Sequence, residues 1–176
     1  MNMTEGPTTA HTNLTAFVAS VAANPLFMRF RGLPVGKELA VSDAMVLFSC
    51  FEEESFRKGE EIYGAGSTSD RTVYMILQGC VSVSDESGNF FSTLGAGDVF
   101  GLFSFLDERP HSVTAAAQEE LTVLSLSRAY FDLITLEDPL LGNRLLHFMF
   151  RLLSHVSLKL ESEYAALRDY TRNLNV

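Results

Sequence analysis

The sequence predicts a mainly β protein, an antiparallel jelly-roll barrel with helices before and after it. Between Phe56 and Leu126, short segments rich in β-branched and aromatic residues are separated by glycine-containing turns. Within these segments apolar and polar residues alternate, for example around Val81 and Val83, as they do in strands with one buried face. On both sides of this region apolar residues recur at helical spacing instead.

The residues before the barrel divide into a tail and a helical segment. Residues 1–13 are mostly polar or small, so we expect a disordered tail. In residues 14–55, apolar residues recur at helical spacing, and Asn24-Pro25 interrupts the first helix. A second short helix is expected over residues 37–51, so this segment is predicted to be helical as a whole.

The barrel is expected over residues 56–128. Residues 85–89 form a polar turn typical of a hairpin. Glycines permit the tight reversals that a small barrel needs where its strands turn. The expected strands are 72–77, 80–83, 90–94 and 121–126. The glycines of the region are Gly59, Gly64, Gly66, Gly79, Gly88, Gly95, Gly97 and Gly101.

Residues 129–176 are expected to form the C-terminal helices, the last of them long. Leucines recur every seven residues from Leu146 to Leu174, with Met149 and Val156 three residues after the first two. This spacing predicts a coiled-coil helix and a parallel homodimer. The alternative is a leucine stripe that packs on its own barrel. The expected interface consists of Leu146, Met149, Leu153, Val156, Leu160 and Leu167.

Composition narrows the choice of partners and compartment. The formal net charge of −9 disfavours nucleic-acid binding by this chain alone. Two cysteines make neither a disulfide framework nor a zinc cluster, so a reducing, cytoplasmic location is expected. The apolar run at residues 14–23 lacks a basic flank and is shorter than the roughly 20 residues that span a bilayer. Neither a signal peptide nor a membrane partner is therefore expected.

Three motifs in the barrel region occur in one order and spacing. They are Phe56-x-x-Gly59-x-x-Ile62, Tyr74-x-Ile76-x-x-Gly79-x-Val81-x-Val83 and Leu94-x-x-Gly97-Asp98-x-Phe100-Gly101. This combination resembles the cyclic nucleotide-binding domain of the catabolite activator family. The resemblance implies a jelly roll of about eight strands, a dimer helix at the C-terminus and a non-catalytic regulatory role in signal transduction.

In that family a phosphate-binding cassette follows the Phe-Gly pair. A glutamate accepts the ribose hydroxyl, an arginine about nine residues further on pairs with the phosphate, and backbone N–H groups complete the cradle. Here Leu102 stands at the glutamate position and His111 at the arginine position, so weak or altered cyclic nucleotide binding is expected. The resemblance assigns the ligand to Gly101, Leu102, Phe103, Ser104, Arg109, His111, Ser112, Val156 and Ser157.

Several interpretations of the cassette remain open. Arg109 is either a replacement cation or a solvated loop residue beside acidic neighbours. His111 either binds an anion in its protonated form or is a polar residue at the rim without a ligand. The apolar run at residues 102–106 is core packing, or else it marks a filled pocket or one that suits an apolar ligand.

No enzyme or metal site is expected. The four histidines form no His-x-His pair, and the sequence contains no Gly-x-Ser-x-Gly elbow. Arg168 and Arg172 alone do not make a DNA-reading surface, so direct DNA recognition is not expected. Two functions remain: a dimeric sensory module for a cyclic nucleotide or another small ligand, without a permanent cofactor, and a ligand-free dimeric scaffold that binds a protein partner.

Overall fold

The computed structural model describes the backbone of residues 8–174 and the side chains of residues 16–172. The chain divides between Phe51 and Glu52 into two compact units. Part of the expected disordered tail, residues 1–7, lies outside the described residues. Residues 8–13, which were also expected to be disordered, belong to the first helix. Each residue added to an existing helix gains one hydrogen bond and fixes only its own backbone, so a helix is easily extended.

The N-terminal unit is helical, as its periodicity predicts. The Asn24 side chain accepts a hydrogen bond from the Leu26 N–H and so caps the helix that Pro25 begins. The rings of Phe27 and Phe48 pack edge to face, with their centroids 5.4 Å apart. The helices are α1 Thr8–Ala23, α2 Pro25–Gly32, α3 Pro34–Lys37 and α4 Val41–Phe48.

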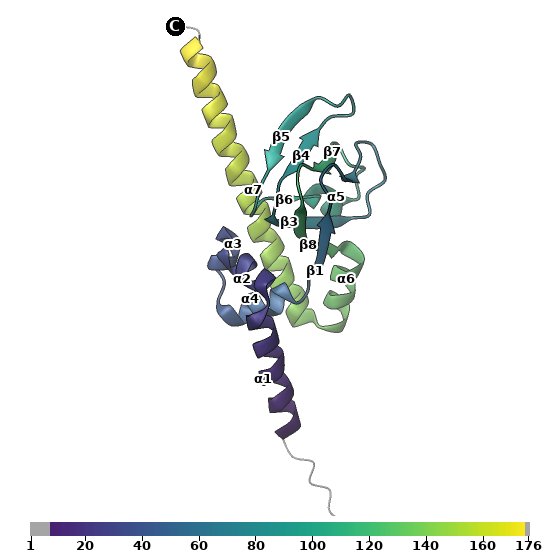
Figure 1. Cartoon of the computed structure of the whole chain (residues 1–176), viewed down its shortest axis with the longest axis vertical. Helices are drawn as coiled ribbons and strands as arrows, with labels where there is room; N and C mark the ends of the chain where they lie inside the picture. The colour runs from purple at the N-terminus through teal and green to yellow at the C-terminus, as the bar shows by residue number, and fades with distance from the viewer. Residues whose placement is uncertain (1–7, 175–176) are drawn as a thin grey trace, which may run out of the picture. The chain divides into compact units, whose positions relative to one another are not determined.

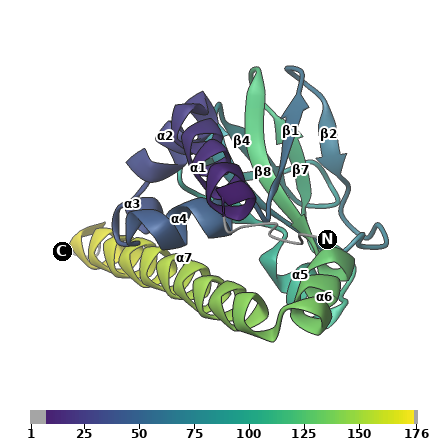
Figure 2. The ribbon, with the colours of Figure 1, turned by 90° about the horizontal axis from the view of Figure 1, so that it is seen from below.

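The second unit contains the jelly roll (Figures 1 and 2), and the predicted fold class is confirmed. Two antiparallel four-stranded sheets have the orders β1-β8-β3-β6 and β2-β7-β4-β5. The four strands predicted by residue range differ from the observed ones by one residue at most. The strands are β1 Glu52–Phe56, β2 Glu61–Tyr63, β3 Thr72–Gln78, β4 Val81–Ser84, β5 Phe90–Leu94, β6 Val99–Phe100, β7 Thr114–Ala117 and β8 Leu121–Ser127.

The barrel begins at Glu52, earlier than the expected start at Phe56. The three glutamates at residues 52–54 lie in β1, which is an edge strand and pairs with β8 alone. An edge strand tolerates charged side chains because they remain in solvent, and they also discourage pairing with other chains. Composition alone therefore does not distinguish this strand from a polar turn.

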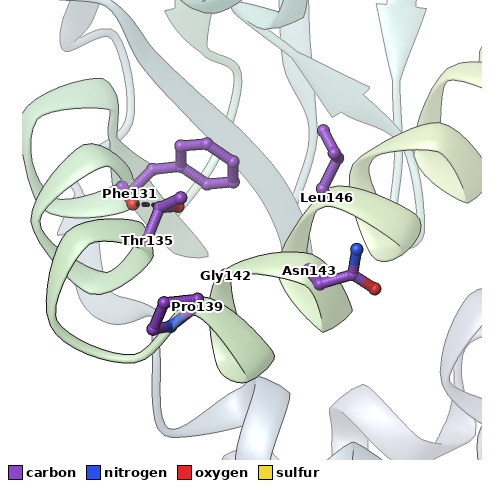
Figure 3. Close-up of a pocket in the computed structure, with 6 residues that line it drawn as sticks. All are labelled: Phe131, Thr135, Pro139, Gly142, Asn143 and Leu146. Carbon is purple, nitrogen blue, oxygen red and sulfur yellow. Dashed lines mark hydrogen bonds between the residues drawn. The ribbon is translucent and has the colours of Figure 1, made fainter.

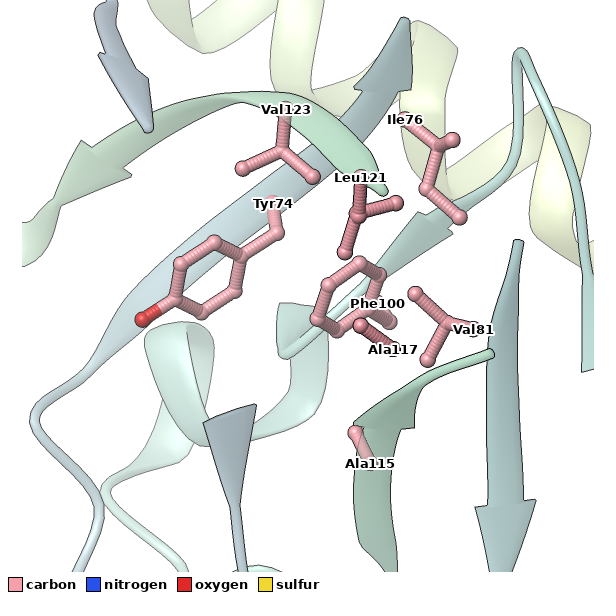
Figure 4. Close-up of a cluster of buried hydrophobic side chains, with 8 residues drawn as sticks. All are labelled: Tyr74, Ile76, Val81, Phe100, Ala115, Ala117, Leu121 and Val123. Atoms are coloured by element: carbon pink, nitrogen blue, oxygen red, sulfur yellow. The ribbon is translucent and has the colours of Figure 1, made fainter. Parts of the chain in front are cut away.

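A cluster of buried apolar side chains drawn from both sheets fills the barrel (Figure 4). The rings of Tyr74 and Phe100 stack with centroids 5.0 Å apart and an interplanar angle of 13°. The small residues of β7, Ala115 and Ala117, leave room for these rings between the sheets. The cluster comprises Tyr74, Ile76, Val81, Phe100, Ala115, Ala117, Leu121 and Val123.

Two helices follow the barrel, α6 Arg128–Glu137 and α7 Pro139–Leu174. They cross closely at Gly142, where an added Cβ would lie 2.7 Å from the Thr135 Cα. A pocket of about 210 Å³ lies beside this crossing (Figure 3). None of the helices in residues 8–174 combines the length and hydrophobicity that a membrane span needs.

Candidate ligand-binding site

The segment that corresponds to the cassette begins where β6 ends. Gly101 has a φ of 75° and precedes the short helix α5, Leu102–Asp107. A Cβ at residue 101 would lie 2.3 Å from the Thr72 carbonyl oxygen. Glycine is therefore required twice, for its backbone conformation and for the close approach of β3. The Phe-Gly motif thus fixes the position of α5 against the barrel.

Helix α5 divides the apolar run at residues 102–106 into two faces. Leu102 and Phe105 are buried, with exposures of 3% and 1%, whereas Phe103 and Leu106 are 61% and 43% exposed. Two of the run's side chains therefore belong to the core. Because Leu102 is among them, the position of the family's glutamate holds a buried hydrocarbon side chain that accepts no hydrogen bond.

The His111 side chain is 5% exposed and lies inside the unit, not at its rim. Its ring stacks on Tyr63, with centroids 3.6 Å apart and planes inclined by 7°. Its Nδ1 atom lies 3.3 Å from the Ser104 hydroxyl. Burial lowers the pKa of His111, and the nearby Asp70 carboxylate opposes this shift only in part. His111 is consequently a neutral partner of Tyr63 and Ser104 at neutral pH.

Tyr63, which the sequence analysis did not assign to the site, completes this arrangement. Burial raises the pKa of the Tyr63 hydroxyl to about 12, and the nearby Gly101 backbone N–H opposes this shift only in part. Its ring also lies 6.0 Å from that of Phe100, centroid to centroid. The signal available in the sequence was its place on a short strand after Ile62, facing the barrel interior, but that pattern is also typical of an ordinary core tyrosine.

Arg109 lies in the loop after α5 with its side chain 77% exposed, and it pairs with Asp107. This is the solvated-loop arrangement, although the arginine remains the exposed cation of the cassette. Ser112 is exposed as well. The structure thus gathers Gly101, Ser104 and His111 around one inward-facing cluster and leaves Phe103, Arg109 and Ser112 at the surface.

The remaining two candidates, Val156 and Ser157, lie on α7. Val156 is half-buried and Ser157 is exposed. Just beyond them, the Lys159 Nζ atom lies 2.7 Å from both carboxylate oxygens of Asp98. Asp98 also accepts a hydrogen bond from the Gly95 N–H, so this ion pair joins α7 to the turn between β5 and β6.

Helix α7 has a buried face and an exposed apolar stripe. Leu145, Phe148, Met149 and Leu152 are all buried within the described chain. Met149, assigned to the dimer interface from the heptad spacing, is thus already buried in a single chain, with an exposure of 4%. The exposed stripe instead runs through Leu146, Phe150, Leu160, Tyr164 and Leu167, with the half-buried Leu153 on the same line. The side chain of Leu174 lies outside the described residues.

This stripe contains the predicted leucines, but the residues between them differ from those that the heptad count predicted. Its members alternate in spacings of four and three, as Leu146, Phe150 and Leu153 illustrate, and this is the spacing of a coiled-coil seam. Phe150 therefore takes the place that the heptad count gave to Met149, and Tyr164 lies on the same line.

The described side chains, residues 16–172, contain no group of three or more His, Cys, Asp or Glu residues that could hold a metal ion.

Comparisons with known proteins agree with the architecture. Residues 53–138 match the family model of the cyclic nucleotide-binding domain. The cyclic AMP receptor protein of Thermus thermophilus is 26% identical over 135 residues, which cover 74% of this chain. The chain spans 62% of the length of that relative.

Two solved structures show the same fold. A cyclic nucleotide-binding domain from Methylobacillus flagellatus gives a TM-score of 0.61 at 21% identity, covering 76% of this chain and 77% of that one. The catabolite activator protein of Thermus thermophilus gives a TM-score of 0.54 at 26% identity, covering 74% of this chain and 63% of that one.

Proposed function

Since residues 53–138 belong to the cyclic nucleotide-binding domain family, we propose that this chain is a non-catalytic regulatory module in which cyclic nucleotide binding is weak or altered. The module acts as a homodimer through α7, and it works in the reducing environment of the cytoplasm. Neither Cys50 nor Cys80 forms a disulfide, which is compatible with that compartment. The net charge of −9 argues against nucleic acid as a direct partner of this chain.

The observation that carries the proposal is the environment of Leu102 and His111. Leu102 is buried where the family has an acceptor for the ribose hydroxyl, and His111 is buried, neutral and stacked where a cation is expected. Each charge-assisted hydrogen bond contributes about 1.5–3 kcal/mol, so the loss of two weakens binding by about 100-fold or more. Arg109 is the remaining cation of the cassette.

The exposed stripe of α7 supports the dimer. Burying a leucine or phenylalanine side chain contributes about 1.5–3 kcal/mol, and the stripe presents several of them along one helix face. Two copies of α7 packed in parallel would cover Phe150, Leu160 and Leu167 together.

A second function, a ligand-free dimeric scaffold for a protein partner, is favoured by one observation. The ring of His111, at the position of the family's phosphate-binding arginine, is 5% exposed and already stacked on Tyr63 at 3.6 Å. On this alternative, no small ligand occupies the barrel, and the protein partner binds the outer surface of the dimer.

Thermal unfolding with added nucleotides distinguishes the two functions. A ligand that binds only the folded state raises its melting temperature in proportion to the logarithm of ligand concentration once the site is nearly saturated. The sensory module should show such a rise with a cyclic mononucleotide or dinucleotide only at high ligand concentration. Absence of any rise across the panel would favour the scaffold, whereas a large rise at micromolar ligand would contradict weak binding.

A further inference from the structure

Arg71 is a cation that lies beside the cassette in space but precedes it in the sequence. It is followed by Thr72, whose carbonyl oxygen would lie 2.3 Å from a Cβ added to Gly101. At the other end of α5, the Arg71 Nη1 atom lies 2.8 Å from the Oε1 atom of Glu108, the residue that caps the helix. The backbone of Arg71 is thus next to the start of α5, and its guanidinium is at the end of the same helix.

The loop that carries Arg71 is bonded to the cassette and to the barrel. The His111 N–H donates a hydrogen bond of 3.2 Å to the Ser67 carbonyl. The Arg71 N–H donates one of 2.8 Å to the Ser69 hydroxyl oxygen, and the Arg71 carbonyl accepts one of 2.9 Å from the Arg128 N–H. Because both polar groups of its backbone are bonded, Arg71 has a fixed point beside α5 from which its side chain extends.

Arg71 and Glu108 share an uncommon backbone conformation. Their φ angles are 59° and 63°, and within residues 8–174 every other residue with a positive φ is a glycine. Residues with a Cβ atom rarely adopt this conformation. The strain persists only where the surrounding contacts impose it, and such strain is concentrated at binding and switch sites. The two strained residues are also the two partners of one ion pair, which marks this pair as a candidate binding feature.

The ion pair leaves part of the Arg71 guanidinium unbonded. Glu108 pairs with Nη1, whereas the Nε atom is buried and has no hydrogen-bond partner among the described residues. A guanidinium presents its N–H groups as a planar fork that fits two oxygen atoms of a phosphate at once. The Glu108 side chain is 68% exposed, and exposed ion pairs are weak because solvent screens them. An oxyanion that accepts from two N–H groups therefore competes well with Glu108.

Arg71 is better placed to hold an anion than Arg109 is. Its side chain is 31% exposed, against 77% for Arg109. A half-buried cation is screened less by salt, and it has less conformational freedom to lose when a ligand binds. The carboxylate of the adjacent Asp70 is held by two other donors, the Thr72 N–H and the Tyr74 hydroxyl.

We infer that Arg71 is an anion-binding residue of the ligand site and that Glu108 is an internal competitor for it. The ligand class is a small molecule with a phosphodiester group, such as a cyclic nucleotide, whose charged oxygens replace the Glu108 carboxylate on the guanidinium. This role rests on the proposed function, because it names a residue that binds the phosphate in the same weakened site. It also gives the weakness a further cause, since a ligand must first displace Glu108.

Calorimetric titration with cyclic AMP at low ionic strength tests the competition. Glu108→Gln removes the competing charge and retains the size of the side chain, and Arg71→Gln removes the cation. Asp107→Asn is the matched control, because it removes the same charge from the neighbouring carboxylate, which pairs with Arg109. The double variant, Arg71→Gln with Glu108→Gln, shows whether a gain in affinity depends on Arg71. Thermal unfolding reports whether each variant is folded.

We expect Glu108→Gln to bind cyclic AMP about tenfold more tightly than the unmodified protein, because the charge that competes with the ligand is lost. Asp107→Asn and the double variant should show no such gain. No gain in a folded Glu108→Gln variant would overturn the inference. An equal gain in Asp107→Asn, or a gain that persists in the double variant, would overturn it as well, since neither depends on Arg71.

A second variant and a second measurement cover the case in which Glu108→Gln does not fold. Glu108→Asn removes the same charge, and asparagine adopts a positive φ more readily than other residues with a Cβ. Nitrogen NMR spectra of the arginine side chains of the unmodified protein are also recorded with millimolar cyclic AMP. The Arg71 Nε signal should shift, and a shift of the Arg109 signal without one at Arg71 would overturn the inference.

Failure of the proposed function gives a different result. Tight binding by the unmodified protein would contradict a weakened site, while the NMR shift of Arg71 would still decide its role. If the unmodified protein bound no cyclic AMP, binding that appeared in Glu108→Gln and was lost in the double variant would still support Arg71. Absence of binding in both the unmodified protein and a folded Glu108→Gln variant would overturn the inference.

Discussion

Leu102 and Phe103 are neighbours in α5, yet one is 3% and the other 61% exposed. Replacing each with alanine therefore separates core packing from surface exposure. Leu102→Ala should lower the free energy of unfolding by about 2–5 kcal/mol, through lost burial and the cavity left behind. Phe103→Ala should change it by less than about 0.5 kcal/mol, as surface substitutions do. Urea unfolding followed by circular dichroism measures both, and equal effects would place Leu102 outside the core.

The burial of His111 makes stability depend on pH. Its pKa in the folded state is lowered by burial, so below the unfolded value of about 6.5 the unfolded chain binds the proton more readily. This contribution is fully present above about pH 6.5 and decreases as the pH falls from there towards the folded-state pKa, by at most about 1.4 kcal/mol per pH unit.

Comparison with His111→Asn isolates this contribution from the other titrating groups. Unfolding free energies of both proteins are measured at pH 7.5 and pH 5.5. The unmodified protein should lose more stability than the variant on acidification. An equal loss in both proteins, or a smaller one in the unmodified protein, would show that the histidine is accessible to protons in the folded state.

At the scale of elements, the two faces of α7 differ in exposure. Leu145, Phe148 and Leu152 are buried on one face, and Phe150 and Leu160 are exposed on the other, where the proposed dimer would cover them. Leu153→Lys combined with Leu160→Lys should convert the dimer to a monomer, because two buried charges would oppose each other across the seam. Light scattering coupled to size exclusion gives the mass directly.

A matched pair of substitutions lies away from the seam on the same helix. Leu158 and Ser162 are exposed, and Leu158→Lys combined with Ser162→Lys adds the same charge without touching the stripe. This control should remain a dimer. A dimeric Leu153→Lys and Leu160→Lys variant would show that the interface lies elsewhere.

At the scale of the whole molecule, the barrel was predictable because its signals are local and act together. Glycines with positive φ, such as Gly79 and Gly101, must lie where strands turn or approach closely, so their joint spacing encodes the fold. The edge strand β1 was less predictable, because its glutamates at residues 52–54 resemble a polar turn until their pairing with β8 is known.

The candidate site was predictable in its location but not in its contacts. Gly101 and Leu102 could be identified from the motif, since the cassette directly follows it in the sequence. The contact between Tyr63 and His111 joins residues far apart in the chain, and nothing in either local pattern indicates it. Likewise, the heptad count does not show that Met149 is buried and Phe150 exposed, because that depends on how α7 packs.

Calorimetric titration of the unmodified protein with cyclic AMP and cyclic GMP at pH 8 tests the central claim most directly. At this pH His111 is neutral, and Leu102 supplies no acceptor, so both of the family's polar contacts are absent. The account predicts no binding tighter than about 100 μM for either nucleotide. Micromolar or tighter binding at pH 8 would show that Arg109 or another group replaces these contacts, and the proposal of a weakened site would be wrong.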